Sequence, residues 1–213
     1  MAIARTWLLV AAEQREFNGI VKRFGGSKPW DWPARFAAQA EFSGDRWLLI
    51  ANGPGAALVN QALSRSTGEQ GVQVNGIIST GFCGALDPAL RVGDIVRELF
   101  SIDRVAVTAA EKHDLRVRTG AAAVDMESAA IARKALEWRV PFYSIRAVSD
   151  TAEEDMPLDF NAYRSRDGRF SRTRIALAAL ARPVSRVPAL LRLDRNCQIA
   201  AESLGDCFAH CRL

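Results

Sequence analysis

The chain has 213 residues, of which 49% are hydrophobic, and its formal net charge is +4. A chain of this length can bury one sizeable core, so we expect a single domain over residues 1–213. No apolar run approaches the ~20 residues that a membrane-spanning helix needs, and the N-terminal apolar run lacks the cleavage site of a signal peptide. With four cysteines in such a chain, we expect reduced thiols in a cytoplasmic protein.

Apolar runs alternate with helical patterns along the chain. Short leucine-rich or β-branched runs bounded by Gly, Asn, Asp or Pro predict buried strands over 6–12, 46–52, 75–81, 93–99 and 141–149. Periodic apolar residues predict helices over 13–24, 55–66, 127–138 and 198–211. This order predicts the α/β class, with a three-layer sandwich in which helices flank a mixed, mostly parallel sheet. In such folds ligands gather beyond the carboxyl ends of the strands.

Two glycine turns follow predicted strands. NGPGAAL at 52–58 has Leu58 where the dinucleotide-binding pattern requires its third glycine, so it is either a tight turn or a binding loop. In STGFCGALDP at 79–88, Gly81 and Gly84 flank a turn whose backbone N–H groups could face an anion. A turn that only needs glycine for its positive φ explains the same pattern.

The stretch AVDMESAAIA at 123–132 places two acids, Asp125 and Glu127, at the entrance of an apolar helix. Residues two apart on an extended segment point the same way, and two carboxylates cannot both face an apolar core without a large cost. At least one should therefore cap the helix or face a polar ligand. A carboxylate accepts two hydrogen bonds at once, which suits a vicinal diol such as that of a ribose.

A third acid ends the predicted strand in PFYSIRAVSDTAEED at 141–155. This strand end carries Arg146, Ser149 and Asp150. A carboxyl group at a strand terminus beside apolar walls can hold a proton at neutral pH, so Asp150 is a candidate general acid.

The C-terminal part is basic. Nine arginines fall between Arg164 and Arg195, in a helical tail that begins at about residue 161. The tail is either a solvated helix face or a surface for anionic lipid or nucleic acid, but the chain carries no nucleic-acid motif. Cys207, His210 and Cys211 lie close together without a second ligand pair, so we expect ordinary helix positions and no metal site.

VDMESAAIA followed by VPFYSIRAVSDTA resembles the signature of the purine nucleoside phosphorylase and methylthioadenosine nucleosidase superfamily. NGPGAALVNQA and IISTGFCGALDPALRVGDIV resemble its glycine turns in the same order, and the match runs from Leu8 to Asp150. GFCGALDP, the TGAAAVDMES junction and the tail are most similar to the hopanoid-associated phosphorylase branch.

The resemblance implies roles for individual residues. It implies that Glu127 binds the ribose hydroxyls, that Met126 packs against the sugar, and that Asp150 protonates N7 of the leaving purine. Asp125 then supports the turn beside the substrate. It also implies that Val105 and Ala106, supported by Asp103, lie next to the base. Phe82, Cys83 and Gly84 of the glycine loop are expected to bind the substrate as well.

Departures from the family concern the nucleophile. Where the hydrolytic nucleosidases carry a glutamate after the first strand, Arg15 aligns here, and Phe82 replaces a serine of the glycine loop. With Thr80 and Gly81, Arg15 is therefore expected to bind phosphate. The chain is also several tens of residues shorter than its family between 93–99 and the segment that follows.

The resemblance thus implies a phosphorylase of a purine nucleoside or a 5′-substituted adenosine, with phosphate as co-substrate and no cofactor. A hydrolytic nucleosidase and a non-catalytic nucleoside-binding protein remain the alternatives. The family implies a homo-oligomer, a dimer or a hexamer. The nearest branch implies an adenosyl hopanoid substrate, for which the basic tail would contact a membrane peripherally.

Overall fold

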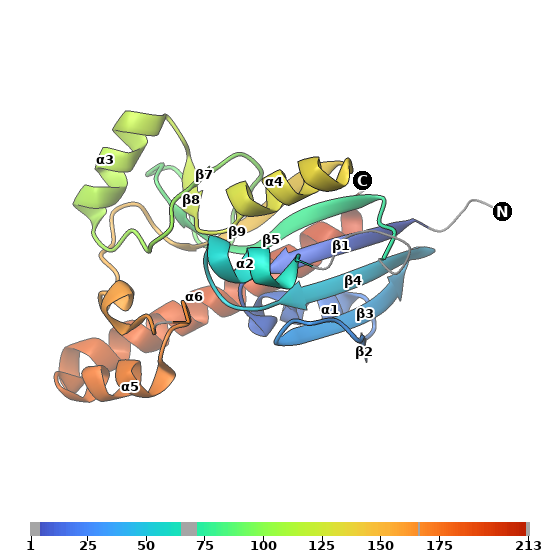
Figure 1. Cartoon of the computed structure of the whole chain (residues 1–213). Coiled ribbons are helices and arrows are strands. Elements are labelled where there is room, and N and C mark those ends of the chain that lie inside the picture. The colour runs from blue at the N-terminus through green and yellow to red at the C-terminus, as the bar shows by residue number, and fades with distance from the viewer. Residues whose placement is uncertain (1–4, 65–71, 166, 212–213) are drawn as a thin grey trace.

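The computed structural model describes residues 5–64, 72–165 and 167–211. In these ranges one sheet runs in the order β2-β3-β4-β1-β5-β8-β7, with β9 beside β5 and β6 (Figure 1). β1 pairs in parallel with β4 and β5, and β5 with β9, whereas β3 runs antiparallel to β4. The strands are β1 (Thr6–Ala11), β2 (Lys28–Pro29), β3 (Phe36–Phe42), β4 (Asp45–Ala51), β5 (Gly76–Ala85), β6 (Ile95–Val96), β7 (Phe100–Ser101), β8 (Ala123–Asp125) and β9 (Phe142–Asp150).

Helices cover both faces of the sheet, as Figure 1 shows. On β1, Trp7 and Leu9 pack against the helices α1 and α6, while Leu8 and Val10 face α2 and α4. This alternation follows from the two-residue repeat of a strand. The predicted three-layer α/β sandwich with a mixed sheet is confirmed. The helical segments are η1 (Gln14–Phe17), α1 (Asn18–Arg23), α2 (Ala56–Ala62), α3 (Ala109–Thr119), α4 (Ser128–Trp138), η2 (Phe160–Tyr163), α5 (Arg172–Leu180) and α6 (Pro183–His210).

One expected strand is much shorter than predicted, and one long strand was not predicted. The run 93–99 forms only the two-residue strand β6, because Gly93 adopts φ 93° and the Asp94 carboxylate accepts from Arg91 N–H in a tight turn. The alanine-rich β3 was not expected, since alanine is a weak strand former. It forms because its full length pairs with the buried strand β4.

Helix boundaries also differ from the expectations. The segment 13–24 divides into η1 and α1, and α6 begins well before residue 198. The last two residues of the predicted helix 55–66 lie outside the described ranges.

α5 and the first turns of α6 project from the body at the lower left of Figure 1. Within the described ranges, no helix is long and apolar enough to cross a membrane.

Candidate active site

A cavity of about 190 Å³ opens beyond the carboxyl ends of β1, β5 and β9 and beside the end of β8. All of the predicted site residues line it except Thr80 and Gly81. Those that do are Arg15, Phe82, Cys83, Gly84, Val105, Ala106, Asp125, Met126, Glu127 and Asp150. The parallel core of the sheet therefore brings together segments that lie far apart in the sequence.

Arg146 is the charged centre behind this cavity. It is fully buried on β9, and its guanidinium nitrogens lie 3.0 Å from Asp125 Oδ2 and 3.0 Å from Glu127 Oε2. It also donates to Ser79 Oγ and to the Phe82 carbonyl. Burial alone lowers the pKa of an arginine, but the surrounding carboxylates outweigh it and raise the pKa of Arg146. Arg146 belongs to the predicted strand-end motif, but its role follows only from these contacts.

Asp125 is bonded mainly to the protein itself. Its Oδ2 accepts from both the backbone N–H and the hydroxyl of Ser128, at the start of α4, and its Oδ1 accepts from the Ser101 hydroxyl. With Arg146 as ion-pair partner, these bonds use both carboxylate oxygens. Asp125 therefore fixes the junction between β8 and α4.

Glu127 lies at the cavity with free hydrogen-bonding capacity. Oε1 accepts from Gly55 N–H at 2.8 Å and Oε2 contacts Arg146, which leaves one lone pair on each oxygen. Burial raises the pKa of Glu127 from 4.5 to about 7, and the opposing effect of Arg146 does not cancel it. Gly55 has φ 92°, and a Cβ there would lie 2.3 Å from the Arg164 guanidinium. Only glycine allows this approach.

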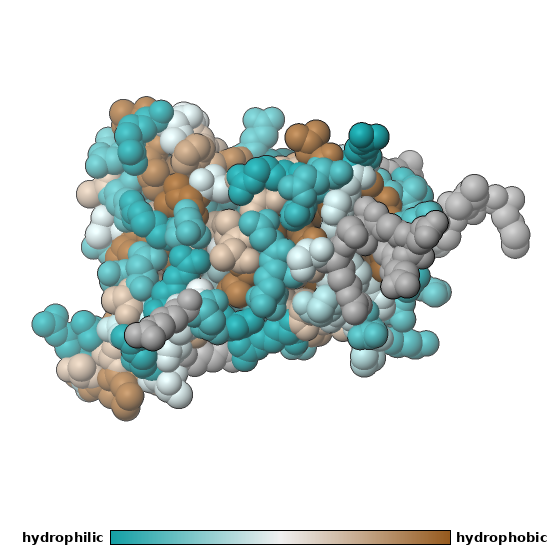
Figure 2. Space-filling view, viewed as in Figure 1, coloured by the Kyte–Doolittle hydropathy of each residue, from teal (hydrophilic) through white to brown (hydrophobic). Residues whose placement is uncertain are grey.

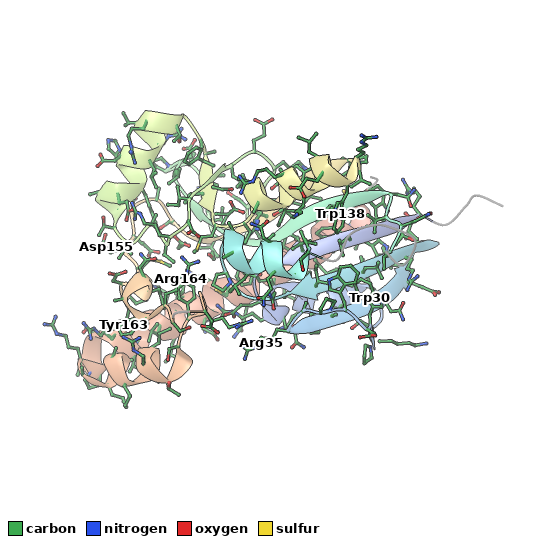
Figure 3. The ribbon with its side chains drawn as sticks, viewed as in Figure 1. Trp30, Arg35, Trp138, Asp155, Tyr163 and Arg164 are labelled. Carbon is green, nitrogen blue, oxygen red and sulfur yellow. The ribbon has the colours of Figure 1, made fainter. Side chains whose placement is uncertain are left out.

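Arg164 holds three segments together by hydrogen bonds, and Figure 3 labels it near η2. Its guanidinium donates to the carbonyls of Asp103, Gly168 and Pro54. It also lies 3.4 Å from the Asp103 carboxylate. The predicted base-pocket segment after Asp103 is thus held against the glycine turn before α2. Val105 is fixed by a reciprocal pair of hydrogen bonds with the Asn161 side chain.

Glu16, which the sequence analysis missed, lines the cavity beside the glycine loop. It is 5% exposed, and its Oε2 accepts from the N–H groups of Ala12 and Glu13 at 2.7 and 2.9 Å. Its Oε1 accepts from Phe82 N–H at 3.0 Å. Burial raises the pKa of Glu16, with Arg146 and these hydrogen bonds opposing it. Glu13 and Glu16 have the three-residue spacing of a capping box, in which each side chain bonds to the backbone N–H of the other residue. This spacing is the sequence pattern that could have indicated Glu16.

This carboxylate corrects the expected anion site. A Cβ on Gly81 would lie 2.8 Å from the Glu16 carboxylate, and Phe82 N–H donates to that carboxylate, so the glycine loop faces a protein acid. Thr80 is fully buried within β5 and does not reach the cavity. Arg15 does, but its side chain is 46% exposed and pairs with Glu13 and Asp194. Arg15, Thr80 and Gly81 therefore do not converge on one site.

Asp150 contacts a buried lysine rather than the apolar wall that the sequence suggested. Its Oδ2 lies 2.6 Å from Lys112 Nζ, and its Oδ1 accepts from the Ser149 hydroxyl at 2.9 Å. Lys112 comes from α3, which no predicted element covered. Cys83, on the same side of the cavity, has its thiol pKa raised by burial. That thiol is therefore neutral.

The described residues contain no group of three or more His, Cys, Asp or Glu side chains that could hold a metal ion. Cys207, His210 and Cys211 belong to the end of α6 and the residue after it.

The chain is similar to known proteins in part of its sequence and in its fold. The family model described as the phosphorylase superfamily matches residues 100–181, which include Glu127 and Asp150. This match covers less than half of the chain. Segments of the chain are 46% identical over 50 residues to a 5′-methylthioadenosine/S-adenosylhomocysteine nucleosidase of Shewanella loihica and 45% identical over 56 residues to that of Shewanella oneidensis. These matches cover 24% and 26% of the chain and 22% and 24% of the relatives, so they span about a quarter of each protein.

Solved structures share the fold of this chain over nearly its whole length. The Neisseria meningitidis 5′-methylthioadenosine/S-adenosylhomocysteine nucleosidase, solved with methylthio-immucillin-A, has a TM-score of 0.69 at 19% identity, covering 96% of this chain and 97% of that one. Futalosine hydrolase of Helicobacter pylori has a TM-score of 0.68 at 13% identity, with 95% of both chains covered. At these identities the likeness establishes the fold.

Proposed function

We propose that this chain cleaves the N-glycosidic bond of a purine nucleoside or a 5′-substituted adenosine. The observation that carries the proposal is one cavity with a carboxylate suited to each half of such a substrate, Glu127 and Asp150. Breaking the bond develops positive charge on the sugar and negative charge on the base. Anionic and proton-donating groups at those two ends favour that transition state.

The sugar end is assigned to Glu127 and Met126. Each carboxylate oxygen of Glu127 keeps one free lone pair, so the side chain can accept hydrogen bonds from the 2′ and 3′ hydroxyls of the ribose. Hydrogen bonds to an ionised carboxylate are stronger than those between neutral groups. Met126, half-buried at the same edge, supplies an apolar contact for the ribose ring. The base end is assigned to Asp150, with Val105 and Ala106 as its apolar wall.

For the nucleophile we favour water activated by Glu16. Its carboxylate lines the cavity, burial raises its pKa in the direction that makes it a better proton acceptor, and Phe82 N–H of the glycine loop donates to it. Phosphorolysis remains the second candidate, because Arg15 lines the same cavity. A guanidinium there could bind phosphate once its pairs with Glu13 and Asp194 open.

The 5′ substituent is assigned to a neighbouring hollow of about 420 Å³. It shares Ala12, Glu13, Pro54 and Phe170 with the first cavity and continues past Arg35, which Figure 3 labels below α2. A hollow of this size favours substituents larger than a methylthio group. The resemblance to the hopanoid-associated phosphorylase branch makes an adenosine with a 5′ hopanoid one of the substrates to test.

The test is an assay of adenine release from adenosine, 5′-methylthioadenosine and adenosines with larger 5′ substituents, with and without phosphate. We expect full release without phosphate, with the free sugar as product. Release that requires phosphate and yields a sugar 1-phosphate would establish phosphorolysis instead. Binding of a nucleoside by calorimetry with no adenine released from any of them would reject catalysis altogether.

A further inference from the structure

Lys112 is the buried charge whose position this function leaves unexplained. It lies on α3, its side chain is 0% exposed, and it lines the cavity. Lysine is seldom fully buried unless its ammonium is paired, because removing the charge from water is costly. Figure 3 labels Asp155 near the lower end of α3, where its carboxylate accepts from Ala109 N–H and holds the start of that helix.

The ammonium of Lys112 has a complete set of partners. Nζ donates to Asp150 Oδ2 at 2.6 Å, to the Thr151 carbonyl at 2.7 Å and to the Glu154 carbonyl at 3.0 Å. An ammonium has three donors and a neutral amine has two. The three acceptors therefore fit the protonated form of the side chain.

These contacts identify the side chain that can supply the proton for the leaving group. Both oxygens of Asp150 act as acceptors, one toward Lys112 and the other toward the Ser149 hydroxyl. The nearest proton is on Lys112 Nζ, within one hydrogen bond of Asp150.

We propose that Lys112 stores the proton that Asp150 passes to the departing base. The inference rests on the proposed function and adds a positioning residue to it. As the C1′–N9 bond breaks, its electron pair goes to the purine. Asp150 gives a proton to N7 and receives one from Lys112 Nζ. Lys112 is left as a neutral amine, and it regains a proton from solvent through Asp150 once the base has departed.

A purely structural role for Lys112 is the competing explanation, because the same bonds dock α3 onto the loop after β9. Arg116 offers a matched control one turn further along α3. Its guanidinium lies 2.6 Å from Asp87 Oδ2 and donates to the Ala121 carbonyl, so it also docks α3. It does not line the cavity.

The decisive variant is Lys112→Arg, tested beside Arg116→Met with adenosine and 5′-methylthioadenosine. Arginine keeps the cation and its donors but does not release a proton in proteins. We expect Lys112→Arg to keep the nucleoside KM within about threefold and to lose about 10²-fold or more in kcat. Arg116→Met should lower thermal stability with kcat nearly unchanged. Turnover of Lys112→Arg close to that of the wild type would overturn the proposal.

A second variant covers the case in which arginine does not fit the site. In Lys112→Ala, ethylammonium should restore kcat in a concentration-dependent way, because it brings a transferable proton into the space left by the side chain. Tetramethylammonium carries charge without such a proton and should not. Equal rescue by both ions would overturn the proposal. If the wild-type protein releases no base in the same assay, the proposed function itself fails.

Discussion

Arg146 explains how several acids can share one buried site. Its guanidinium pairs with both Asp125 and Glu127 at 3.0 Å, and it also attracts Glu16. Removing one partner from such a buried cluster leaves an uncompensated charge, which typically costs about 3–5 kcal/mol. The individual acids therefore depend on one another, and each must be tested by a substitution that preserves its shape.

The ionisation of Glu127 predicts a pH-dependent affinity for ribosides. Burial raises its pKa to about 7, so the carboxylate becomes protonated as the pH falls below that value. The neutral acid binds hydroxyls less strongly, and the nucleoside KM should rise toward acidic pH. Glu127→Gln should have a higher KM that no longer changes with pH in this range. A wild-type KM that stays flat from pH 8 to about 5.5 would contradict the assignment.

The raised pKa of Glu127 also makes the free energy of unfolding depend on pH. Because the folded state binds this proton more tightly than the unfolded state, Glu127 contributes stability fully below its ordinary pKa of 4.5. That contribution is lost as the pH rises through about 7. The change in unfolding free energy caused by Glu127→Gln should therefore be less unfavourable at pH 8 than at pH 4, as urea unfolding at the two pH values would show.

Glu16→Gln tests the nucleophile assignment. The amide keeps the size of the side chain but cannot accept a proton from water, so kcat for base release should fall about 10²-fold or more. Glu41→Gln on the exposed edge of β3 is a suitable control for the loss of one carboxylate. Full turnover in a folded Glu16→Gln protein would remove Glu16 from the mechanism and strengthen the case for phosphate.

At the scale of elements, α1 and α6 cross closely enough that their glycines touch. A Cβ on Gly205 would lie 2.4 Å from the Gly19 carbonyl oxygen, and a Cβ on Gly19 would lie 1.9 Å from that of Ala201. The two helices cover the η1 side of the sheet, with α6 also contacting β9. Small residues at the crossing therefore set the distance between these helices.

Gly205→Ala should destabilise the fold because backbone atoms of α1 cannot move aside cheaply. Overpacking of this kind costs typically about 1–3 kcal/mol, which corresponds to roughly 2–4 °C in Tm per kcal/mol for a domain of this size. Gly44→Ala is the control, because a Cβ there meets nothing within 4 Å and only the positive φ of 82° is strained. A smaller Tm loss in Gly205→Ala than in Gly44→Ala would show that the helices can separate.

At the scale of the whole molecule, the α5–α6 hairpin extends away from the sheet. Apolar residues gather at its tip among hydrophilic ones at the lower left of Figure 2. Leu177, Leu180 and Val184 are 68, 65 and 91% exposed there. The exposed arginines of this region are Arg174, Arg182, Arg192 and Arg195. Apolar side chains with arginines beside them complement an anionic lipid surface.

We therefore expect sedimentation of the protein with anionic liposomes at low salt and weaker binding as the ionic strength rises. Replacing Leu180 and Val184 with serine should reduce binding severalfold. Leu136→Ser, at an equally exposed position on α4, should not. No binding at low salt would remove the membrane contact without affecting the catalytic proposal. The expected dimer or hexamer stays a prediction that sedimentation equilibrium would check.

The sequence by itself determined the layered fold and the two acidic motifs. Strands β1, β4, β5 and β9 are nearly continuous apolar runs, and such runs are recognisable because each strand is buried on both faces. Glu127 and Asp150 stand at strand ends, where local sequence is enough to indicate a site. By contrast, β3 depends on pairing with β4, which its own alanines do not signal.

Only the tertiary structure decided which charges meet. Arg15 and Glu16 are neighbours in sequence, and a turn of η1 directs Glu16 to the glycine loop while Arg15 reaches toward α6. Lys112 and Asp150 are 38 residues apart and meet because α3 docks beside the end of β9. Hydrophobic periodicity reports which face of an element is buried. It does not report which distant side chain neutralises a buried charge, because that partner is set by how the elements pack in three dimensions.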